Sequence, residues 1–566
     1  MIWGLSLLSG VLLSIPWLVP HTGWVVLFAF IPLLIAEEAA TRLKLKGFWW
    51  CHYCTFVLWN VLTTFWVCNA TVGGGIFAIL ANSLQMSVVF GLFHFSRRHL
   101  RSVLPYILLA AAWIAWERLY LNAQISWPWL VLGNAFADTT RLVQWYEWTG
   151  TLGGSLWCWI VNLGLFGSLM TLLEGTWRSW TAAARISAIA SMILLLVLPV
   201  GASFYLYNRY EPEGQTIDVL IAQPNLDPYH KFESMTQAEQ NDVLLRLFSE
   251  GLAQDPSPAL LIAPETFTSD IVLNDIGSSP TVGLFTQFLQ AHPGCEMLFG
   301  ASAFKISDGR SAPSALARPF SDGWLQSYNS ALTLDAEGNV EQYNKRRLVV
   351  GTELTPYPAI FLPLERFVCR IAGIKPPLMG RCEGQGDPAE VLHFRDSIAI
   401  GCAVCYESIY GEFCTDYVRK GARAMTVITN DAWWGDTPGH RQHCNYSRLR
   451  AIELRREIAR CGNTGISCII DGRGNIVSRG PWWEPYQFRS GIHLNDRQTA
   501  FVRHGDIVGR VSTLVFLLIA ALLAASFFRR RASSRSPVYR LFANGFDPTG
   551  QDTSIESPQL SRFWFA

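Results

Sequence analysis

The sequence predicts an α-helical membrane bundle of eight spans joined to an α/β domain that lies outside the cytoplasm. Half of the 566 residues are hydrophobic and only 16% are charged, whereas roughly 25% are charged in an average soluble protein. This deficit is uneven, because residues 1–210 and 510–528 are largely apolar while 215–505 have a mixed composition. The clusters of basic residues after the apolar stretches all fall on one side, while the 121–150 loop on the other side is poor in Lys and Arg, which independently supports the number of spans.

A membrane-spanning helix needs about 20 mostly apolar residues, and eight stretches approach this length. They are residues 2–19, 24–36, 49–67, 73–95, 103–121, 151–173, 186–207 and 510–528. The second stretch is short and is the least certain of the eight. A cleaved signal peptide is the alternative for the first stretch, but that stretch lacks a basic start and a small-residue cleavage site. We therefore expect seven spans within 1–210 and one C-terminal span at 508–528.

The Lys and Arg residues predict how the bundle is oriented. They follow the second, fourth, sixth and eighth stretches, as Arg42, Lys44, Lys46, Arg97, Arg98, Arg101, Arg178, Arg185, Arg529, Arg530 and Arg531. Positive charge marks the cytoplasmic side, so both termini are expected there and 211–507 outside. In a bacterium this is the periplasmic side of the inner membrane. The tail 529–566 is rich in Ser and Pro, and we expect a disordered cytoplasmic extension.

Within 211–507, short apolar runs alternate with polar or amphipathic stretches, which is typical of a layered α/β domain. The expected strands are 216–222, 260–263, 330–334, 340–343, 397–404, 424–429, 466–470 and 476–478. The expected helices are 235–253, 408–420 and 439–461. Residues 335–339 and 471–475 are rich in Asp, Gly and Asn and predict two hairpin turns.

Three residues suited to acyl transfer each follow a predicted strand. Glu265 lies in Leu-Ile-Ala-Pro-Glu-Thr, Lys345 in Tyr-Asn-Lys-Arg-Arg-Leu and Cys405 in Cys-Ala-Val-Cys-Tyr-Glu. A cysteine attacks a carbonyl, a carboxylate moves protons, and an ammonium group stabilises the oxyanion. Each residue alone has an ordinary structural explanation, so the prediction rests on their shared placement at strand ends. We also expect the following helix and Lys345 to favour the thiolate.

These motifs resemble those of the nitrilase superfamily of carbon–nitrogen hydrolases, and residues 1–528 resemble its membrane branch, the apolipoprotein N-acyltransferases. The matching motifs are Ala263–Glu265, Tyr343–Val349, Glu353, Val404–Glu407, Gly411–Glu412, Asn430–Gly435, Arg450–Glu453 and Asn463–Ile466. The resemblance implies a nitrilase-like αββα sandwich with a Glu-Lys-Cys triad. Residues 351–356 depart from the Gly-Glu-Phe-Val-Pro that is common in the family, but this departure does not touch the triad.

The resemblance also implies an activity, which is N-acylation of the N-terminal S-diacylglyceryl-cysteine of bacterial lipoproteins, the last step of their maturation. A membrane phospholipid would donate the acyl chain and an apolipoprotein would accept it, through a thioester on Cys405. Glu265 would act as the base, while Lys345 and a backbone N–H near Tyr406 would bind the oxyanion. The partners would be phospholipid, apolipoprotein and bilayer, without a cofactor. The net charge of +1 gives no indication of nucleic-acid binding, and the oligomeric state stays open.

Other residues are expected around this centre. Glu353 and Glu407 look like carboxylates that orient Lys345 and tune the pocket, with structural salt bridges as the alternative, and Tyr406 is expected to shape the pocket wall. Segment 357–374 is strongly apolar. We interpret it as a loop or helix that rests on the bilayer and gates lipid entry, and the alternative is a helix packed in the core.

Two residue pairs leave alternatives open. Glu117 and Arg118 lie near the outward end of the fifth stretch, either as a pair that satisfies itself or as a wall of a lipid-headgroup site. Cys369 lies within the apolar segment and Cys382 lies after it. The sequence does not decide whether they form a disulfide.

A metal site and two rival functions were weighed against acyl transfer. His440 and His443 invite a metal site, but no carboxylate or cysteine lies at clear ligand spacing, so we expect none. A Cys405–His pair of the cysteine-protease type is not needed, because Glu265 and Lys345 supply the base and the oxyanion donor. The rival functions are a membrane-bound amidase or nitrile hydrolase, and a transporter or scaffold that only binds lipoproteins. Amidases of this fold are mostly soluble, and a transporter would show inverted repeats.

Overall fold

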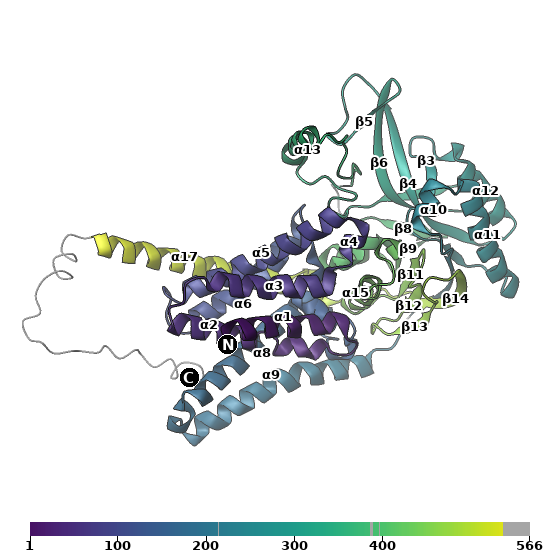
Figure 1. Ribbon diagram of the computed structural model, residues 1–566. Coiled ribbons are helices and arrows are strands. Elements are labelled where there is room, and N and C mark those ends of the chain that lie inside the picture. Colours follow the sequence, from purple (N-terminus) through teal and green to yellow (C-terminus); the bar gives the residue numbers. More distant parts are fainter. Residues whose placement is uncertain (213, 385–388, 396, 536–566) are drawn as a thin grey trace, which may run out of the picture.

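The computed structural model describes residues 1–212, 214–384, 389–395 and 397–535. A helical bundle lies beside an α/β domain, and the C-terminal helix α17 (Ile507–Arg535) runs back along the bundle and extends past it (Figure 1). Most of the predicted cytoplasmic tail, from residue 536 onward, lies outside the described residues.

A helical segment occupies each of the eight predicted apolar stretches. These segments are α1 (Ile2–Leu18), η1 (Gly23–Leu27) with α2 (Ile31–Arg42), α3 (Phe48–Thr64), α5 (Val72–Ser96), α6 (Leu104–Asn122), α8 (Thr151–Leu173), α9 (Ala182–Arg209) and α17. By length and composition, five described segments can cross a membrane: Gly23–Arg42, Val72–Ser96, Thr151–Leu173, Ala182–Arg209 and Ile507–Arg531. Because α1, α3 and α6 are not among them, the count of eight spans stays a prediction.

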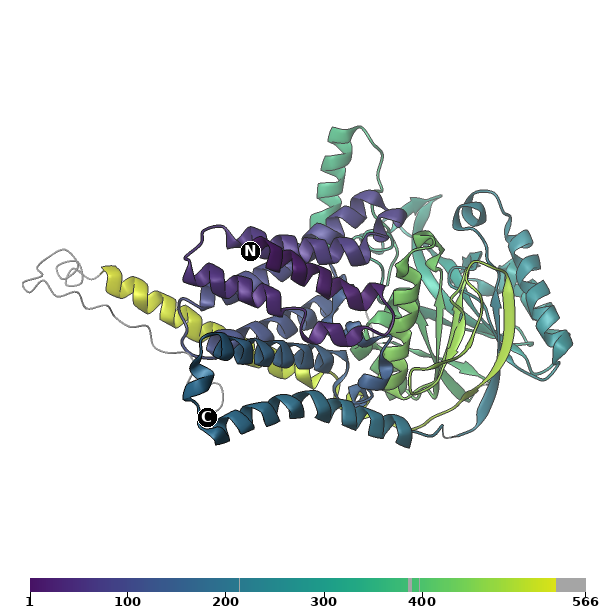
Figure 2. The same cartoon turned by 60° about the horizontal axis from the view of Figure 1, so that its bottom comes forward.

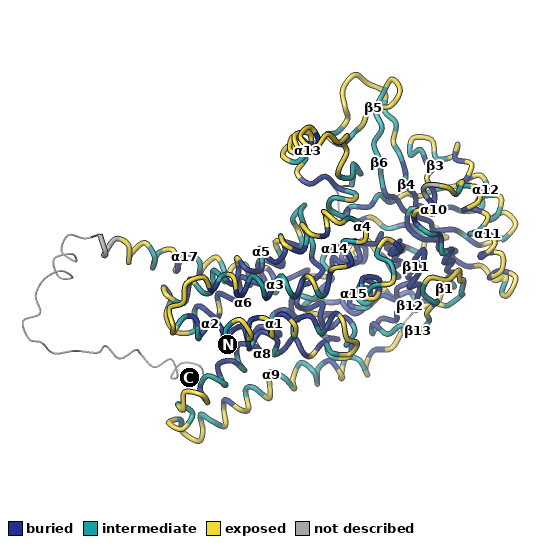
Figure 3. Tube along the Cα trace, viewed as in Figure 1, coloured by how far each residue is buried: buried dark blue, intermediate teal, exposed yellow. Residues whose placement is uncertain are grey.

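The burial of these helices distinguishes the inside of the bundle from its surface. Trp59, Trp113 and Trp159 are fully buried, and Trp113 and Trp159 meet edge to face with ring centroids 5.3 Å apart. In contrast, only 11% of the most apolar part of α9 and 17% of that of α17 are buried (Figure 3). A helix that is apolar on all sides yet unburied is expected to face lipid.

The α/β domain contains two sheets. The first has the order β14-β1-β2-β4-β6-β5, with β3 beside β4 and β7 beside β6, and the second has the order β13-β12-β11-β10-β9-β8. The first comprises β1 (Thr216–Gln223), β2 (Leu260–Ile262), β3 (Thr268–Val272), β4 (Glu296–Asp308), β5 (Arg318–Phe320), β6 (Gly323–Leu334), β7 (Val340–Asn344) and β14 (Tyr486–His493). The second comprises β8 (Val391–Phe394), β9 (Ile398–Val404), β10 (Ala424–Thr429), β11 (Ile458–Gly462), β12 (Cys468–Ile470) and β13 (Ile476–Arg479).

The two sheets pack face to face between two pairs of helices. Cys461 on β11 donates from its thiol to the carbonyls of Ala222 on β1 and Ile262 on β2, at 3.2 and 3.4 Å. Helices α11 (Gln237–Gln254) and α12 (Pro280–Gln290) cover the outer face of the first sheet, and α14 (Gly411–Arg419) and α15 (Pro438–Leu454) cover the second (Figure 2). This confirms the expected αββα sandwich.

Helix α15 lies between the sandwich and the bundle (Figure 2), and its residue Gln442 hydrogen-bonds to the bundle. The Gln442 side-chain oxygen accepts from the indole N–H of Trp129 at 2.7 Å and of Trp66 at 3.3 Å. Its side-chain nitrogen donates to the carbonyls of Trp17 at 3.1 Å and Thr63 at 3.2 Å. All four partners belong to the N-terminal region, so the bundle and the catalytic half share one buried hydrogen-bond network.

The helix predicted at 439–461 is wrong in its last third. Helix α15 ends at Leu454, and residues Ile458–Gly462 form the central strand β11 instead. The chain turns at Arg455, whose backbone is left-handed with φ 48°, and its guanidinium donates to Glu147 at 2.5 Å. The charged residues Arg455, Arg456 and Glu457 are therefore buried after the end of the helix.

Helix α13 (Pro358–Ala372) buries only Glu365 and Cys369 against the rest of the protein. It forms within the apolar segment 357–374 and stands away from both halves (Figures 1 and 2). Its outward residues are Ile360, Leu364, Phe367, Val368 and Ile371, all at least 42% exposed. The alternative of a core-packed helix is therefore wrong. Cys369 and Cys382 are both free thiols.

Candidate active site

The two sheets bring Glu265, Lys345 and Cys405 together at one edge of the sandwich. Glu265 follows β2, Lys345 follows β7 and Cys405 follows β9, so each lies just past the end of a strand. Lys345 Nζ donates to Glu265 Oε1 at 2.8 Å, and Cys405 is close enough to interact electrostatically with both charges. The three residues are 5%, 1% and 8% exposed, respectively, so the site is closed to bulk water.

Cys405 has a strained backbone and a protonated thiol. Its φ is +52°, a left-handed conformation that costs a non-glycine residue on the order of 1–3 kcal/mol. Burial raises the pKa of the thiol well above its usual range, Glu265 and Asp431 raise it further, and Lys345 opposes them only in part. Lys345 favours the thiolate as expected, but burial outweighs it, so the cysteine needs a base at the moment of attack.

Lys345 stays charged because two carboxylates face it. Burial alone would lower the pKa of its ammonium group, but Glu265 and Glu353 raise it well above its usual range. Glu353 Oε1 accepts from Lys345 Nζ at 3.0 Å, and its Oε2 accepts from the backbone N–H of Val349 at 2.8 Å. Glu353 thus contacts Lys345 directly, in the place where the sequence predicted an orienting carboxylate.

Asn329 is a site residue that the sequence did not reveal. Its side-chain nitrogen donates to Glu265 Oε1 and to Glu353 Oε1, both at 2.7 Å, and its backbone carbonyl accepts from the N–H of Lys345 at 2.8 Å. One amide therefore spaces the two carboxylates around the ammonium group. Asn329 lies inside β6, where an isolated Asn gives no motif. The one sequence feature that could have marked it is its position as a polar residue just before the apolar half of a strand.

Glu407 acts on the backbone around the site rather than on the Lys345 ammonium group. Its Oε1 accepts from the N–H groups of Arg346 at 2.6 Å and Arg347 at 3.2 Å, and from the hydroxyl of Tyr343 at 2.8 Å. Its Oε2 accepts from the N–H of Val404 at 2.9 Å. This fully buried carboxylate thus ties the loop after Lys345 to the turn that carries Cys405.

Tyr406 links the nucleophile turn to the membrane bundle. Its hydroxyl donates to the carbonyl of Ser126 at 3.0 Å, and its ring stacks on Trp127 with centroids 6.3 Å apart. The neighbouring Tyr410 hydrogen-bonds the hydroxyl of Ser126 at 2.6 Å. The loop between α6 and α8 therefore contacts the residue that follows Cys405, and the expectation that Tyr406 shapes the pocket stays a prediction.

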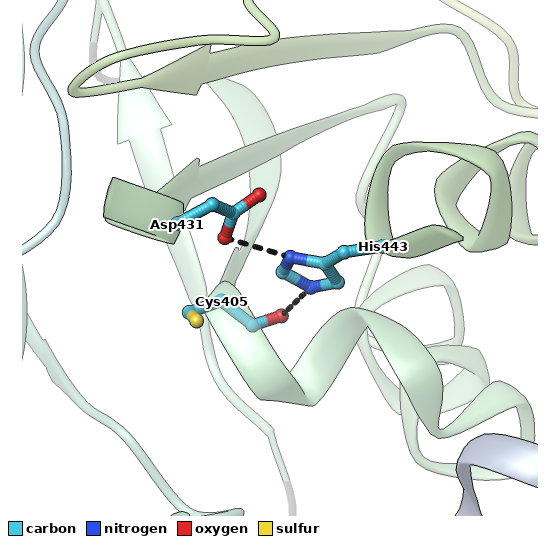
Figure 4. A group of neighbouring side chains, drawn as sticks. All are labelled: Cys405, Asp431 and His443. Atoms are coloured by element: carbon cyan, nitrogen blue, oxygen red, sulfur yellow. Dashed lines mark hydrogen bonds and ion pairs between the residues drawn. The ribbon is translucent and has the colours of Figure 1, made fainter. Parts of the chain in front are cut away.

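A buried ion-pair chain lies behind the nucleophile turn (Figure 4). His443 Nδ1 lies 2.9 Å from Asp431 Oδ1, and Arg460 Nη2 donates to Asp431 Oδ2 at 2.6 Å. Burial would raise the pKa of Asp431, but His443 and Arg460 hold it well below its usual range. The other ring nitrogen of His443 lies 3.1 Å from the carbonyl oxygen of Cys405, so His443 faces the backbone of the nucleophile and forms no protease-type pair with its sulfur.

Cys405, Asp431 and His443 are the one group among the described residues with metal-ligand geometry, because their ligand atoms lie within 4.8 Å of one another. The donor set does not suit a cation. Asp431 already pairs with the guanidinium of Arg460, and both nitrogens of His443 already face oxygen atoms. We therefore interpret the group as an ion-pair chain.

The pair Glu117 and Arg118 does not satisfy itself. Glu117 Oε1 accepts from the indole of Trp113 at 3.0 Å and the N–H of Leu132 at 2.8 Å, while Arg118 lies 3.7 Å from Asp506. Arg118 lines a cleft between the bundle and α14, together with Arg347, Tyr410, Glu412, Phe413, Arg450 and Glu453. None of Glu265, Lys345 and Cys405 lines this cleft, so it is separate from the closed site.

Two family models match the chain. The N-terminal domain of apolipoprotein N-acyltransferase matches residues 9–164, and the carbon–nitrogen hydrolase family matches residues 310–488. The second match contains Lys345 and Cys405 and begins after Glu265. Together the matches cover the bundle up to the middle of α8 and much of the sandwich, and α9 and α17 lie outside them.

Whole-length relatives carry the same name as the first model. An apolipoprotein N-acyltransferase of Chlorobaculum tepidum is 30% identical over 536 residues, covering 92% of this chain and 96% of the relative. One of Geobacter metallireducens is 27% identical over 544 residues, covering 93% and 95%. Among solved structures, Saccharomyces cerevisiae Nit3 of the nitrilase superfamily is 15% identical with a TM-score of 0.34, covering 49% of this chain and 90% of Nit3. An amidase of Nesterenkonia sp. AN1 is 16% identical with a TM-score of 0.34, covering 52% and 99%.

Proposed function

The chain belongs to the apolipoprotein N-acyltransferase family, and on this premise we propose that it N-acylates the S-diacylglyceryl-cysteine of lipoproteins with an acyl chain from a membrane phospholipid. It is a multi-pass membrane protein and an acyltransferase with a nitrilase-type domain. The observation that carries the proposal is the closed site in which Lys345 Nζ lies 2.8 Å from Glu265 Oε1 beside the Cys405 thiol.

In the first half-reaction the Cys405 sulfur attacks an ester carbonyl of the phospholipid. Glu265 takes the thiol proton as the S–C bond forms, because a thiol with a raised pKa does not ionise unaided. The carbonyl oxygen becomes an oxyanion, and Lys345 and the backbone N–H of Tyr406 are the proposed donors to it. The C–O bond then breaks, Glu265 returns its proton to the leaving alkoxide, and lysophospholipid departs. A thioester remains on Cys405.

In the second half-reaction the free α-amine of the lipoprotein cysteine attacks the thioester. Glu265 accepts a proton from the amine as the C–N bond forms, and the sulfur leaves as the Cys405 thiol. The overall conversion of an ester into an amide is downhill, so no nucleotide is needed. Water is the competing acceptor, and the nearly complete burial of the three residues supports transfer over hydrolysis.

Such a closed site needs an entrance for lipid, and we propose that α13 provides it. The helix begins at Tyr357, whose N–H donates to Gln124 of the bundle at 2.7 Å. It presents Phe367, Ile371 and neighbouring apolar side chains to the outside. An exposed amphipathic helix beside a membrane bundle is suited to rest in the bilayer interface, where it can open and close the path from lipid to Cys405.

We further propose that 1–210 and 508–528 form the membrane part, that 211–507 face the periplasm, and that the membrane is the bacterial inner membrane. The one-sided Lys and Arg residues support this orientation. Reporters fused after residues 45, 100, 180 and 535 should be cytoplasmic, and those at 135 and 300 external. A cytoplasmic reporter at 300 would overturn the orientation and the proposed access to lipoproteins.

Intact-mass analysis of the purified protein mixed with phospholipid tests the reaction. One fatty-acyl mass should appear on Cys405 together with an equal amount of lysophospholipid, and hydroxylamine should remove it, because it cleaves thioesters more readily than amides. Adding a diacylglyceryl-cysteine peptide should then move the acyl group to the peptide amine. Ammonia release from small amides without any lipid product would indicate an amidase instead. An absence of both reactions would favour a lipoprotein-binding role.

A further inference from the structure

The peptide group that follows the nucleophile is held from behind. The carbonyl oxygen of Cys405 accepts from Ser408 Oγ at 2.7 Å and lies 3.1 Å from His443 Nε2 (Figure 4). His443 is fully buried on α15, and Asp431 and Arg460 continue the chain from its other nitrogen. The mechanism above uses none of these contacts, although they end on the backbone of its central residue.

The contacts of His443 indicate which of its ring nitrogens holds the carbonyl of Cys405. Nδ1 lies 2.9 Å from a carboxylate oxygen of Asp431 and 3.3 Å from Arg460 Nη2. Ser408 gives its single hydroxyl hydrogen to the carbonyl of Cys405, so its own oxygen, 3.1 Å from Nε2, is an acceptor there. Nε2 therefore faces two acceptors and takes the donor role toward the carbonyl of Cys405.

The carbonyl of Cys405 shares a peptide plane with the N–H of Tyr406. This peptide bond is trans, and a trans peptide directs its C=O and N–H to opposite sides. Holding the carbonyl on the His443 side therefore fixes the N–H of Tyr406 on the opposite side. That N–H lies in the first turn of η7 (Cys405–Ile409), where helix N–H groups have no partner inside the helix.

Hydrogen bonds to the carbonyl have a second effect on the same group. They polarise the amide, and a polarised amide is a stronger donor through its N–H. They also support the left-handed backbone of Cys405, whose φ of +52° needs compensating contacts. Orientation, polarisation and backbone support all act on the donor that an oxyanion beside Cys405 would use.

We propose that His443, oriented by Asp431, is a positioning residue for the oxyanion site, because it holds the Cys405–Tyr406 peptide so that the N–H of Tyr406 faces the oxygen of the acyl carbonyl under attack. This inference rests on the proposed acyl transfer at Cys405. His443 acts through the peptide group and takes no proton from the sulfur. Lys345 supplies the second donor to the oxyanion.

The test compares two reactions of the same sulfur in the full-length protein. Alkylation by iodoacetamide is a displacement at a saturated carbon and forms no oxyanion, whereas acylation by phospholipid forms one. Both rates are measured by intact mass at one pH, in wild type and in His443→Leu. Removing an oxyanion donor costs about 10²–10³-fold in rate, so losing its support should slow acylation about 10- to 100-fold. Alkylation should stay close to the wild-type rate.

Conservative variants sharpen the expectation. His443→Gln keeps an N–H donor that reaches toward the carbonyl of Cys405, and it should recover most of the acylation rate. Ser408→Ala removes only the other side-chain donor to the same oxygen, and it should slow acylation by about three- to tenfold, in line with one neutral hydrogen bond. Ser408→Ala also keeps the proposal testable if His443→Leu does not fold.

His440→Leu is the matched control. His440 lies one turn earlier on α15, is also buried, and stacks on Trp482 with ring centroids 3.6 Å apart, without a bond to Cys405. It should leave the ratio of acylation to alkylation unchanged. Equal acylation in wild type and His443→Leu, or a parallel loss of both rates, would overturn the inference alone. An absence of any acyl adduct in wild type would overturn the proposed function and this inference with it.

Discussion

The pocket around Cys405 and helix α13 are built in opposite ways. In the pocket, the charged groups of Glu265 and Lys345 are buried, Glu353 is nearly so, and every one of them has a hydrogen-bond partner within 3.1 Å. Helix α13 instead exposes its apolar face, with Phe367 60% and Ile371 72% exposed. The pocket is held by short polar contacts inside the protein, whereas the apolar face of the helix is the surface that we propose to meet the bilayer.

This difference suits the pocket to the chemistry and helix α13 to the control of lipid access. A buried charge network tolerates little change, since removing one member leaves the others unpaired in a dry site. An exposed apolar helix tolerates substitution without loss of fold, since its side chains have few contacts to lose. Changes in the pocket should therefore affect the reaction itself, and changes in α13 should affect only how lipid reaches it.

The largest effect is expected at the sulfur. Cys405→Ala should abolish the acyl adduct and lower N-acylation by more than about 10³-fold, because no other group can form the thioester. Cys405→Ser should also lose most activity, because a neutral hydroxyl is a poorer nucleophile without a matched base. Mass mapping after incubation with phospholipid measures both. An adduct that forms normally in Cys405→Ala, or that maps to Cys402 or Cys414, would contradict the mechanism.

A smaller but still large effect is expected for the amide that spaces the carboxylates. Asn329→Leu removes one donor to each of Glu265 and Glu353, both of which keep Lys345 as a donor, and each lost hydrogen bond to a charged group costs about 1.5–3 kcal/mol of stability. We expect N-acylation to fall about 100-fold and the melting temperature to drop. Ser330→Ala is the matched control, because the next residue of the strand bonds only Asn344. Near-normal activity in Asn329→Leu would show that the pocket is less rigid than its geometry indicates.

Substitutions on α13 should affect access alone. The double variant Phe367→Ser/Ile371→Ser should slow acylation by phospholipid in vesicles about tenfold, since lost apolar contact with the bilayer weakens lipid entry. Acylation by a short-chain, water-soluble ester and the melting temperature should not change. Val477→Ser, at a position that is 60% exposed on β13, serves as the control. An equal loss with both donors would assign α13 to the chemistry and remove the contrast with the pocket.

The smallest effect concerns the resting thiol. Because burial raises the pKa of Cys405 well above its usual range, its rate of alkylation by iodoacetamide should still rise with pH beyond pH 9. A free thiol levels off near its pKa of about 8.5. The sign follows from desolvation, which disfavours the thiolate and delays ionisation to higher pH. A rate that becomes constant below pH 8 would instead indicate a thiolate at rest.

The sequence predicted the parts of the site that carry motifs and missed those that fold into place. Glu265, Lys345 and Cys405 were found because each follows a strand and resembles a known motif. Asn329 was missed because it lies within a strand, and the role of His443 because its partners, Asp431 and the carbonyl of Cys405, are distant in sequence. The end of α15 was misplaced because Arg455 is charged, and its burial against Glu147 depends on the bundle.

The four hydrogen bonds of Gln442 have a consequence for how the protein is made. The catalytic half is synthesised after the helices that supply Trp17, Thr63, Trp66 and Trp129, and its central helix is complete only when those partners surround it. A chain that began at residue 211 would leave this amide buried without partners or exposed with its apolar surroundings. The bundle thus supplies partners that the catalytic half lacks on its own, so a chain without the bundle should be less stable than the full chain.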